Sequence, residues 1–153
     1  MLLRLKPIVL TLLLVWWLPF SVPLLAELLI SEALLQRIEN EYDSEARQRV
    51  EAWQILMQEN QDLSEREKLA VVNDFFNSNV LFVDDIFLWN KEDYWATPIE
   101  MLSLGAGDCE DYSIAKYFTL KQLGVDEDKL RITYVKAIDL NQAHMVLTYF
   151  ENK

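Results

Sequence analysis

The chain has 153 residues, which is enough for one domain with a real core but not comfortably for two. Its 25 acidic residues outnumber its 14 basic ones, and the net charge is −11 at pH 7. This balance argues against binding nucleic acid or an anionic membrane surface through charge, because phosphate groups need Lys and Arg. It permits divalent cations, although most of these acids are expected to form an ordinary solvated surface.

Residues 1–26 have the pattern of an export signal. Arg4 and Lys6 precede an uncharged run, rich in Leu, Val and Trp, that lasts to Ala26. A positive start and an apolar middle are typical of a secretory signal. A run of about 20 apolar residues can also persist as an uncleaved anchor. We expect export, with a single domain over residues 27–153.

Residues 27–78 are predicted to be helical. One helical stripe is formed by Ala46, Val50, Trp53 and Met57. Ser64 and Glu67 have the spacing of a capping box for a helix that runs to about Asn77. Its inward-facing side chains are expected to be Leu69, Val72 and Phe76. Residues 79–90 are expected to be extended or irregular.

A short capped helix follows in ATPIEMLSLGAG. Thr97 is the expected N-cap, Pro98 the first helical residue and Glu100 the capping-box partner. Gly105 and Gly107 are expected to end this helix.

The next helix is predicted to run from about Cys109 to Leu123 and to close at Gly124. Its apolar residues lie on most of its sides, which indicates a buried helix. Two strands are predicted over residues 130–138 and 143–150, joined as a hairpin. The fold class is therefore α+β, with N-terminal helices and a central buried helix packed on an antiparallel sheet.

Cys109 is the chain's one cysteine, so no internal disulfide can form. Three roles remain for it: it forms a disulfide with another molecule, it is a buried structural thiol, or it is a reactive thiol. The start of a helix favours the thiolate. Its acidic neighbours disfavour it, unless a bound cation neutralises them. These neighbours are Asp108, Glu110 and Asp111.

The only histidine, His144, lies in the second predicted strand and could serve as the base for Cys109. A histidine in a strand is also a common hydrogen-bonded structural residue. One Cys and one His fall short of a zinc site. The order of the pair, with Cys on a buried helix and His on a sheet, matches papain-like and transglutaminase-like enzymes.

The segments DYWATPIEMLSLGAGDCEDYSIAKYFTLKQLGV and LRITYVKAIDLNQAHMVLTYF resemble the bacterial transglutaminase-like cysteine proteinases, the LapG type of periplasmic protease. The resemblance covers roughly residues 60–150. It implies a papain-like/transglutaminase-like fold and dependence on Ca²⁺. It also implies cleavage of a large surface adhesin near its N-terminus, which promotes biofilm dispersal. An inner-membrane cyclic di-GMP receptor is the implied regulatory partner.

By position, the resemblance makes Cys109 the nucleophile and His144 the general base. Asp108 and Glu110 match the acids linked to calcium in the family, with Asp111 a weaker candidate. Clustered carboxylates suit Ca²⁺, although the spacing in DCEDY is not that of an EF-hand. Trp95, just upstream, is expected either to line the substrate groove or to be a core aromatic.

These enzymes orient the histidine with an Asp on a later strand, somewhat less than 20 residues further on. The sequence ends at Lys153, so the chain is expected to be C-terminally incomplete. A hairpin that places His144 opposite Ala137 leaves Asp139 at the turn, where it is a poor substitute. The alternatives are a weakened or inactive binding module of the same fold, and an acyl-transferring transglutaminase or amidase.

Overall fold

The computed structural model describes residues 30–139 and 141–152, so the predicted export segment, residues 1–26, lies outside the described residues. In chain order the elements are α1 (Glu32–Glu41), α2 (Ser44–Glu59), α3 (Glu65–Asn79), β1 (Leu81–Phe82), α4 (Asp85–Leu88), α5 (Pro98–Leu104), β2 (Ala106–Gly107), α6 (Cys109–Gln122), η2 (Glu127–Lys129), β3 (Leu130–Ala137) and β4 (Gln142–Tyr149). The predicted α+β class is confirmed. No helix within the described ranges is long and apolar enough to cross a membrane.

Both predicted capping boxes are confirmed. The Ser64 N–H donates to Glu67 at 2.9 Å, and the Thr97 N–H donates to Glu100 at 2.8 Å. These contacts satisfy backbone groups that the first helical turn leaves without a partner. Gly105 caps the end of α5 with φ of +68°, a left-handed conformation that suits glycine.

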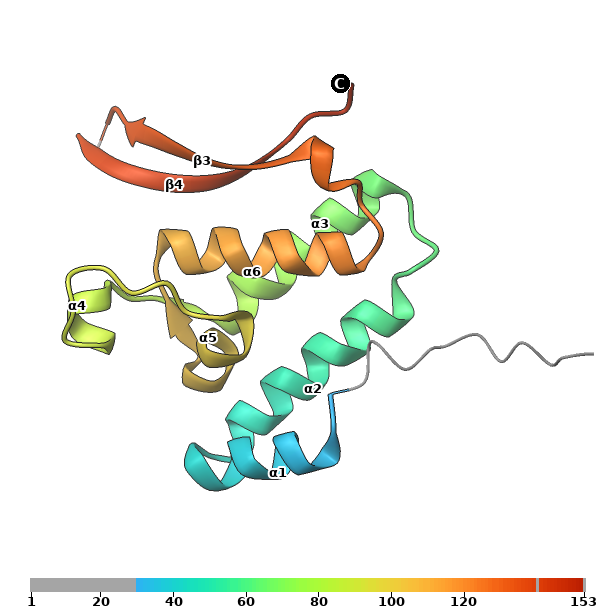
Figure 1. Ribbon diagram of the computed structural model, residues 1–153, viewed down its shortest axis with the longest axis vertical. Helices are drawn as coiled ribbons and strands as arrows, with labels where there is room; N and C mark the ends of the chain where they lie inside the picture. Colours follow the sequence, from blue (N-terminus) through green and yellow to red (C-terminus); the bar gives the residue numbers. More distant parts are fainter. Residues whose placement is uncertain (1–29, 140, 153) are drawn as a thin grey trace, which may run out of the picture.

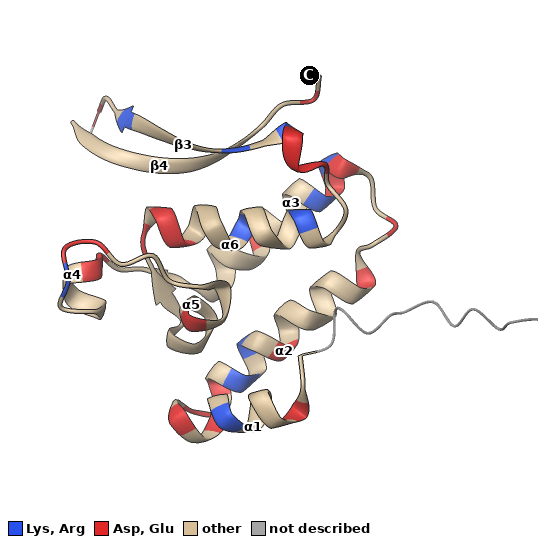
Figure 2. Ribbon diagram, viewed as in Figure 1, with Lys and Arg blue, Asp and Glu red and all other residues tan. Residues whose placement is uncertain are grey.

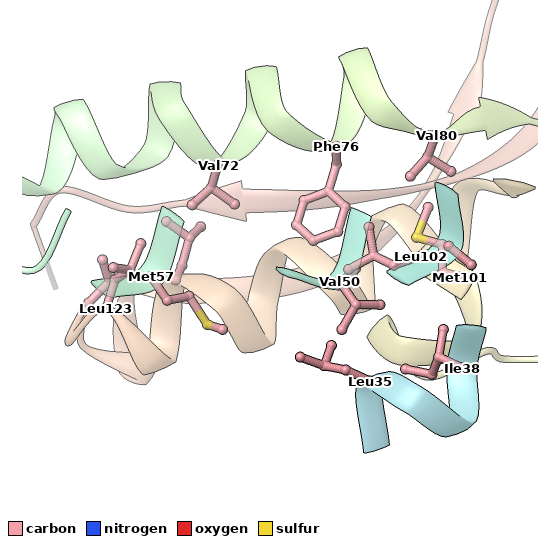
Figure 3. Packing of buried hydrophobic residues seen from close by; sticks show 14 of the residues in the cluster. Leu35, Ile38, Val50, Met57, Val72, Phe76, Val80, Met101, Leu102 and Leu123 are labelled. Atoms are coloured by element: carbon pink, nitrogen blue, oxygen red, sulfur yellow. The ribbon is translucent and has the colours of Figure 1, made fainter. Parts of the chain in front are cut away.

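Helix α6 occupies the centre of the molecule, with the β3–β4 hairpin on one side, α5 on the other, and α3 packed alongside it (Figure 1). Figure 3 shows Val72 and Phe76 pointing from α3 into the core, with Val50 next to Phe76. Trp53 reaches α6 from α2 and donates its indole N–H to Thr119 Oγ1 at 2.9 Å. The prediction that α6 is apolar and buried on most sides needs one correction, because Phe118 is 53% exposed.

The hairpin forms as predicted, but with a different register. His144 pairs with Val135, not with Ala137. The turn lies one residue earlier than expected, with Gln142 already in β4 and Asn141 adopting a positive φ of 50°. The partner shifts by two residues, so His144 stays on the predicted face of the strand.

The segment after α3 was expected to be extended or irregular. Instead it contains a two-residue strand and a short helix, β1 and α4. Strand β1 pairs in parallel with β2, with Leu81 opposite Ala106 and Phe82 opposite Gly107. Gly107 is therefore a strand residue beyond the end of α5. This pairing brings α4 next to the start of α6, where acidic side chains gather (Figure 2).

Candidate active site

Cys109 is the first residue of α6 and is partly exposed. The chain reaches it through Gly107, where a side chain has no room. A Cβ atom there would lie 2.9 Å from Asp111 Oδ2 and 3.1 Å from the Met101 methyl. The glycine just before DCED thus lets the backbone pass close to the buried Asp111.

The thiol is held protonated by its surroundings. Burial and the adjacent Glu110 together raise the pKa of Cys109 to about 11, although a hydrogen bond from the Met145 backbone lowers it. The thiol donates a hydrogen bond to Glu110 Oε2 at 3.0 Å. The effect expected of the acidic neighbours is present in Glu110, and together with burial it outweighs the lowering of the thiol pKa by the Met145 backbone.

Strand β4 brings His144 to Cys109. Met145, next to His144 in the strand, contacts the thiol through its backbone. Cys109 and His144 together line two adjoining hollows, each with a volume of about 610 Å³. The structure therefore places the sole cysteine and the sole histidine on the walls of the same open site.

The first hollow lies beside α4 and the hairpin turn. Its walls combine acids and aromatic residues, among them Asp93, Asp108, Glu110, Phe82, Trp95 and Tyr134. Trp95 is 56% exposed, so it is not a core aromatic, and it faces this hollow. Its indole N–H donates to Asp93 Oδ1 at 2.9 Å.

The carboxylates at the start of α6 belong to a larger cluster. Two further acids, Asp85 of α4 and Asp93 of the following loop, have carboxylate oxygens within 4.8 Å of a Glu110 oxygen and of one another. Asp85 also forms such a group with Asp108 and Asp111. Sequence reasoning missed Asp85 and Asp93, because only the β1–β2 pairing brings α4 to this point.

This cluster is short of positive charge. Burial is the main cause that raises the pKa of Asp108 to about 8, that of Asp111 to about 6, and that of Asp85 above its usual range. None of the ion pairs in the described part of the chain involves these groups. Asp85 is 2% exposed.

Two buried oxygens of the cluster, Asp85 Oδ1 and Asp108 Oδ1, have no hydrogen-bond partner among the residues described. Buried carboxylates without a partner are costly. A hard divalent cation takes oxygen ligands of this kind. The residues present therefore suit a Ca²⁺ ion, and the candidate ligands fall in two groups that share Asp85: one with Asp93 and Glu110, the other with Asp108 and Asp111.

Asp111 is already engaged with the backbone. Its Oδ1 accepts from the Ala96 N–H at 2.7 Å, and its Oδ2 accepts from the Asp108 N–H at 3.4 Å. It is 1% exposed. It ties the loop before α5 to the start of α6, and it also belongs to one of the carboxylate groups that could hold a cation.

Asp139 lies exposed in the turn after β3, where the hairpin prediction places it. It forms no hydrogen bond with His144 among those found in residues 30–139 and 141–152. It therefore does not orient the imidazole in this structure.

Comparison with known proteins identifies the family. Residues 39–152 match the family model for bacterial transglutaminase-like cysteine proteinases (BTLCP). LapG of Legionella pneumophila is 40% identical, with a TM-score of 0.68, over 81% of this chain and 68% of that one.

Its calcium-bound structure aligns over 80% of this chain and 67% of that one, with the same 40% identity and a TM-score of 0.68. Its EGTA-treated structure aligns over 81% of this chain and 66% of that one, also with 40% identity and a TM-score of 0.68. A comparison with curated protein sequences gives no match. The site and these matches establish that the chain belongs to the bacterial transglutaminase-like cysteine proteinases and is a cysteine peptidase.

Proposed function

We propose that this chain is a calcium-dependent endopeptidase of the periplasm that cleaves a large surface adhesin near its N-terminus. The observation that carries the proposal is one open site lined by Cys109 and His144 and bordered by buried carboxylates with unpartnered oxygens. The family resemblance supports the adhesin as substrate, its release from the cell surface as the outcome, and an inner-membrane cyclic di-GMP receptor as regulator. The signal pattern in residues 1–26 supports export.

The chemistry follows from the two side chains. His144 takes the thiol proton as the Cys109 sulfur attacks the scissile carbonyl carbon, and a thioester forms when the C–N bond breaks. The imidazolium returns its proton to the leaving amine. Water then hydrolyses the thioester with His144 as base and regenerates the thiol. The N–H groups of the first turn of α6 lack partners within the helix and are suited to stabilise the oxyanion.

Glu110 links the proposed calcium site to the nucleophile. Glu110 is both the hydrogen-bond acceptor of the thiol and a member of the carboxylate cluster. A cation held by Asp85, Asp93, Asp108 and Glu110 would supply the positive charge that these acids lack. The calcium-bound structure of the Legionella pneumophila relative supports the choice of metal.

The test uses purified chain and the N-terminal region of a large surface adhesin from the same organism. With Ca²⁺ we expect one cleavage in that region, with excess EGTA we expect none, and added Ca²⁺ should restore it. Cys109→Ser should lose at least about 10³-fold in rate while its circular dichroism stays unchanged. A folded Cys109→Ser chain that still cuts would refute the mechanism. Incorporation of a labelled amine in place of hydrolysis would favour acyl transfer.

A further inference from the structure

A groove extends beyond the catalytic pair along α6. The second hollow runs from Cys109 and His144 between α3, α6 and β4. A third hollow of about 240 Å³ continues it, and the two share Asn73, Lys116 and Leu147 on their walls. An extended polypeptide placed across Cys109 can therefore continue in this direction.

Lys116 carries the only Lys or Arg charge on the described walls of these hollows. Its Nζ donates to Asn73 Oδ1 and to Asn77 Oδ1, both at 2.8 Å. The same Nζ lies 5.2 Å from the centre of the Tyr112 ring. These contacts hold the ammonium group at one place on the groove wall.

Both hydrogen-bond acceptors of Lys116 are neutral amides. An ammonium group has three N–H donors, and these bonds use two of them. Burial lowers the pKa of Lys116, and the negative charge of Asp74 opposes this by raising it. Among the ion pairs of residues 30–139 and 141–152, none involves Lys116. The ammonium group therefore has one N–H donor left for a ligand and no carboxylate partner among the described residues.

Helix geometry fixes the distance from the reacting bond. Lys116 follows Cys109 by seven residues in the same helix, which is almost two full turns. Both residues therefore lie on one face of α6, about 10 Å apart along its axis. An extended peptide advances about 3.3 Å per residue, so Lys116 lies level with a substrate position about three residues from the scissile bond.

We propose that Lys116 is a specificity-determining residue that binds an Asp or Glu side chain of the substrate about three residues from the cleaved bond. This rests on the proposed endopeptidase function. The opposite end of the groove carries negative charge outside the proposed cation ligands, because Asp84 and Glu92 line the first hollow. An acidic substrate residue is repelled there and attracted at Lys116.

A purely structural lysine would also bridge α3 and α6 through its two asparagines. The two roles differ in what a substitution changes. Loss of a structural bridge lowers stability and affects all substrates alike. Loss of a substrate contact changes which peptides are cleaved and mainly raises KM, because the contact is made before and during the reaction.

The experiment profiles cleavage of a proteome-derived peptide library by the full chain in Ca²⁺. Wild type should enrich Asp and Glu about three residues from the cut, on one side. Lys116→Gln should lose this enrichment, and Lys116→Glu should replace it with Lys and Arg.

For one peptide carrying the acid, Lys116→Gln should lower kcat/KM by about tenfold, mostly through KM. Lys121→Gln is the matched control, since Lys121 sits on the same helix in an exposed ion pair with Glu127.

Iodoacetamide labelling of Cys109 should proceed at the wild-type rate in both Lys116 variants, which shows that they are folded at the site. A wild type that cuts without any acidic preference overturns the subsite alone, as does a preference that survives in both variants. A wild type that cleaves no library peptide and no adhesin overturns the proposed endopeptidase function, and the subsite with it.

Discussion

Glu110 has two competing interactions beside the nucleophile. Burial raises its pKa, but hydrogen bonds from the Cys109 thiol, its own backbone N–H, Asp108 and Asp93 together lower it below its usual value, so the carboxylate is ionised. The same negative charge helps to keep the thiol protonated. A cation that takes Glu110 as a ligand therefore also removes an obstacle to forming the thiolate.

This coupling predicts a gain in thiol reactivity from losing an acid. In EGTA, Glu110→Gln should lower the pKa of Cys109 and speed its alkylation by iodoacetamide at pH 7.5 several-fold, up to about tenfold. The rate of loss of free thiol measures it. Glu92→Gln, which removes another carboxylate of the first hollow, should leave the rate unchanged. Slower alkylation of Glu110→Gln would contradict this account of the thiol.

At the scale of elements, α2 supports the segment that leads to the nucleophile. Arg49 Nε donates to the carbonyl of Leu102 at 2.6 Å, and its Nη2 donates to that of Ser103 at 2.9 Å. These carbonyls lie in the last turn of α5, where they have no partner within the helix. A Cβ at Gly105 would lie 2.9 Å from the same guanidinium.

Arg49→Met should therefore destabilise the protein by about 2–3 kcal/mol, because two carbonyls lose charge-assisted partners. Urea unfolding in EGTA, followed by circular dichroism, measures the loss. Arg37→Met is the control, since Arg37 makes an exposed pair with Glu41 within α1 and such pairs contribute at most about 1 kcal/mol. Equal losses in the two variants would show that the contacts to α5 contribute little.

The helices could be predicted because their ends are local. Ser64 with Glu67, and Thr97 with Glu100, are signals within four residues of chain, and Gly105 ends α5 through its own φ. The pairing of Cys109 with His144 could also be anticipated, because a buried helix has few places to pack except the one predicted hairpin.

The remaining features depend on contacts distant in sequence. The hairpin register depends on whether Gln142 belongs to the turn or to β4. The alternation of side chains along the strands does not decide this, and in the structure Gln142 pairs with Ala137. The two-residue pairing of β1 with β2 has too few residues to show a periodicity, yet it carries Asp85 to Asp108. Asp85 looked like one acid in an irregular stretch, and only its burial distinguishes it.

At the scale of the whole molecule, the acidic residues differ in whether a basic side chain lies beside them. The chain has a net charge of −11. Many acids on α1, α2 and α3 have basic partners, such as Arg47 with Glu32 and Lys129 with Glu65. Among the described residues, the acids around the start of α6 form no ion pair, so a cluster of carboxyl groups there lacks basic partners (Figure 2). Ca²⁺ bound there should stabilise the whole domain, because the unfolded chain lacks the assembled site.

We expect Ca²⁺ at 100 times its Kd to add about 2.7 kcal/mol to the free energy of unfolding, seen as a higher Tm than in EGTA. Mg²⁺ should raise the Tm less, since it demands a tighter octahedral shell. Asp85→Asn should abolish the calcium shift. It should also leave the metal-free protein as stable as wild type or more so, because it removes a buried carboxyl group that is costly to ionise and keeps an acceptor for the Tyr94 N–H.

Asp84→Asn is the matched control for this substitution. Asp84 is the neighbouring residue but is exposed, and its side chain makes no capping hydrogen bond. It should keep most of the calcium shift. If Asp85→Asn instead lowers the metal-free Tm and keeps the shift, Asp85 is a structural acid that supports the loop through Tyr94. The cation site would then consist of the carboxylates of α6 and Asp93 alone.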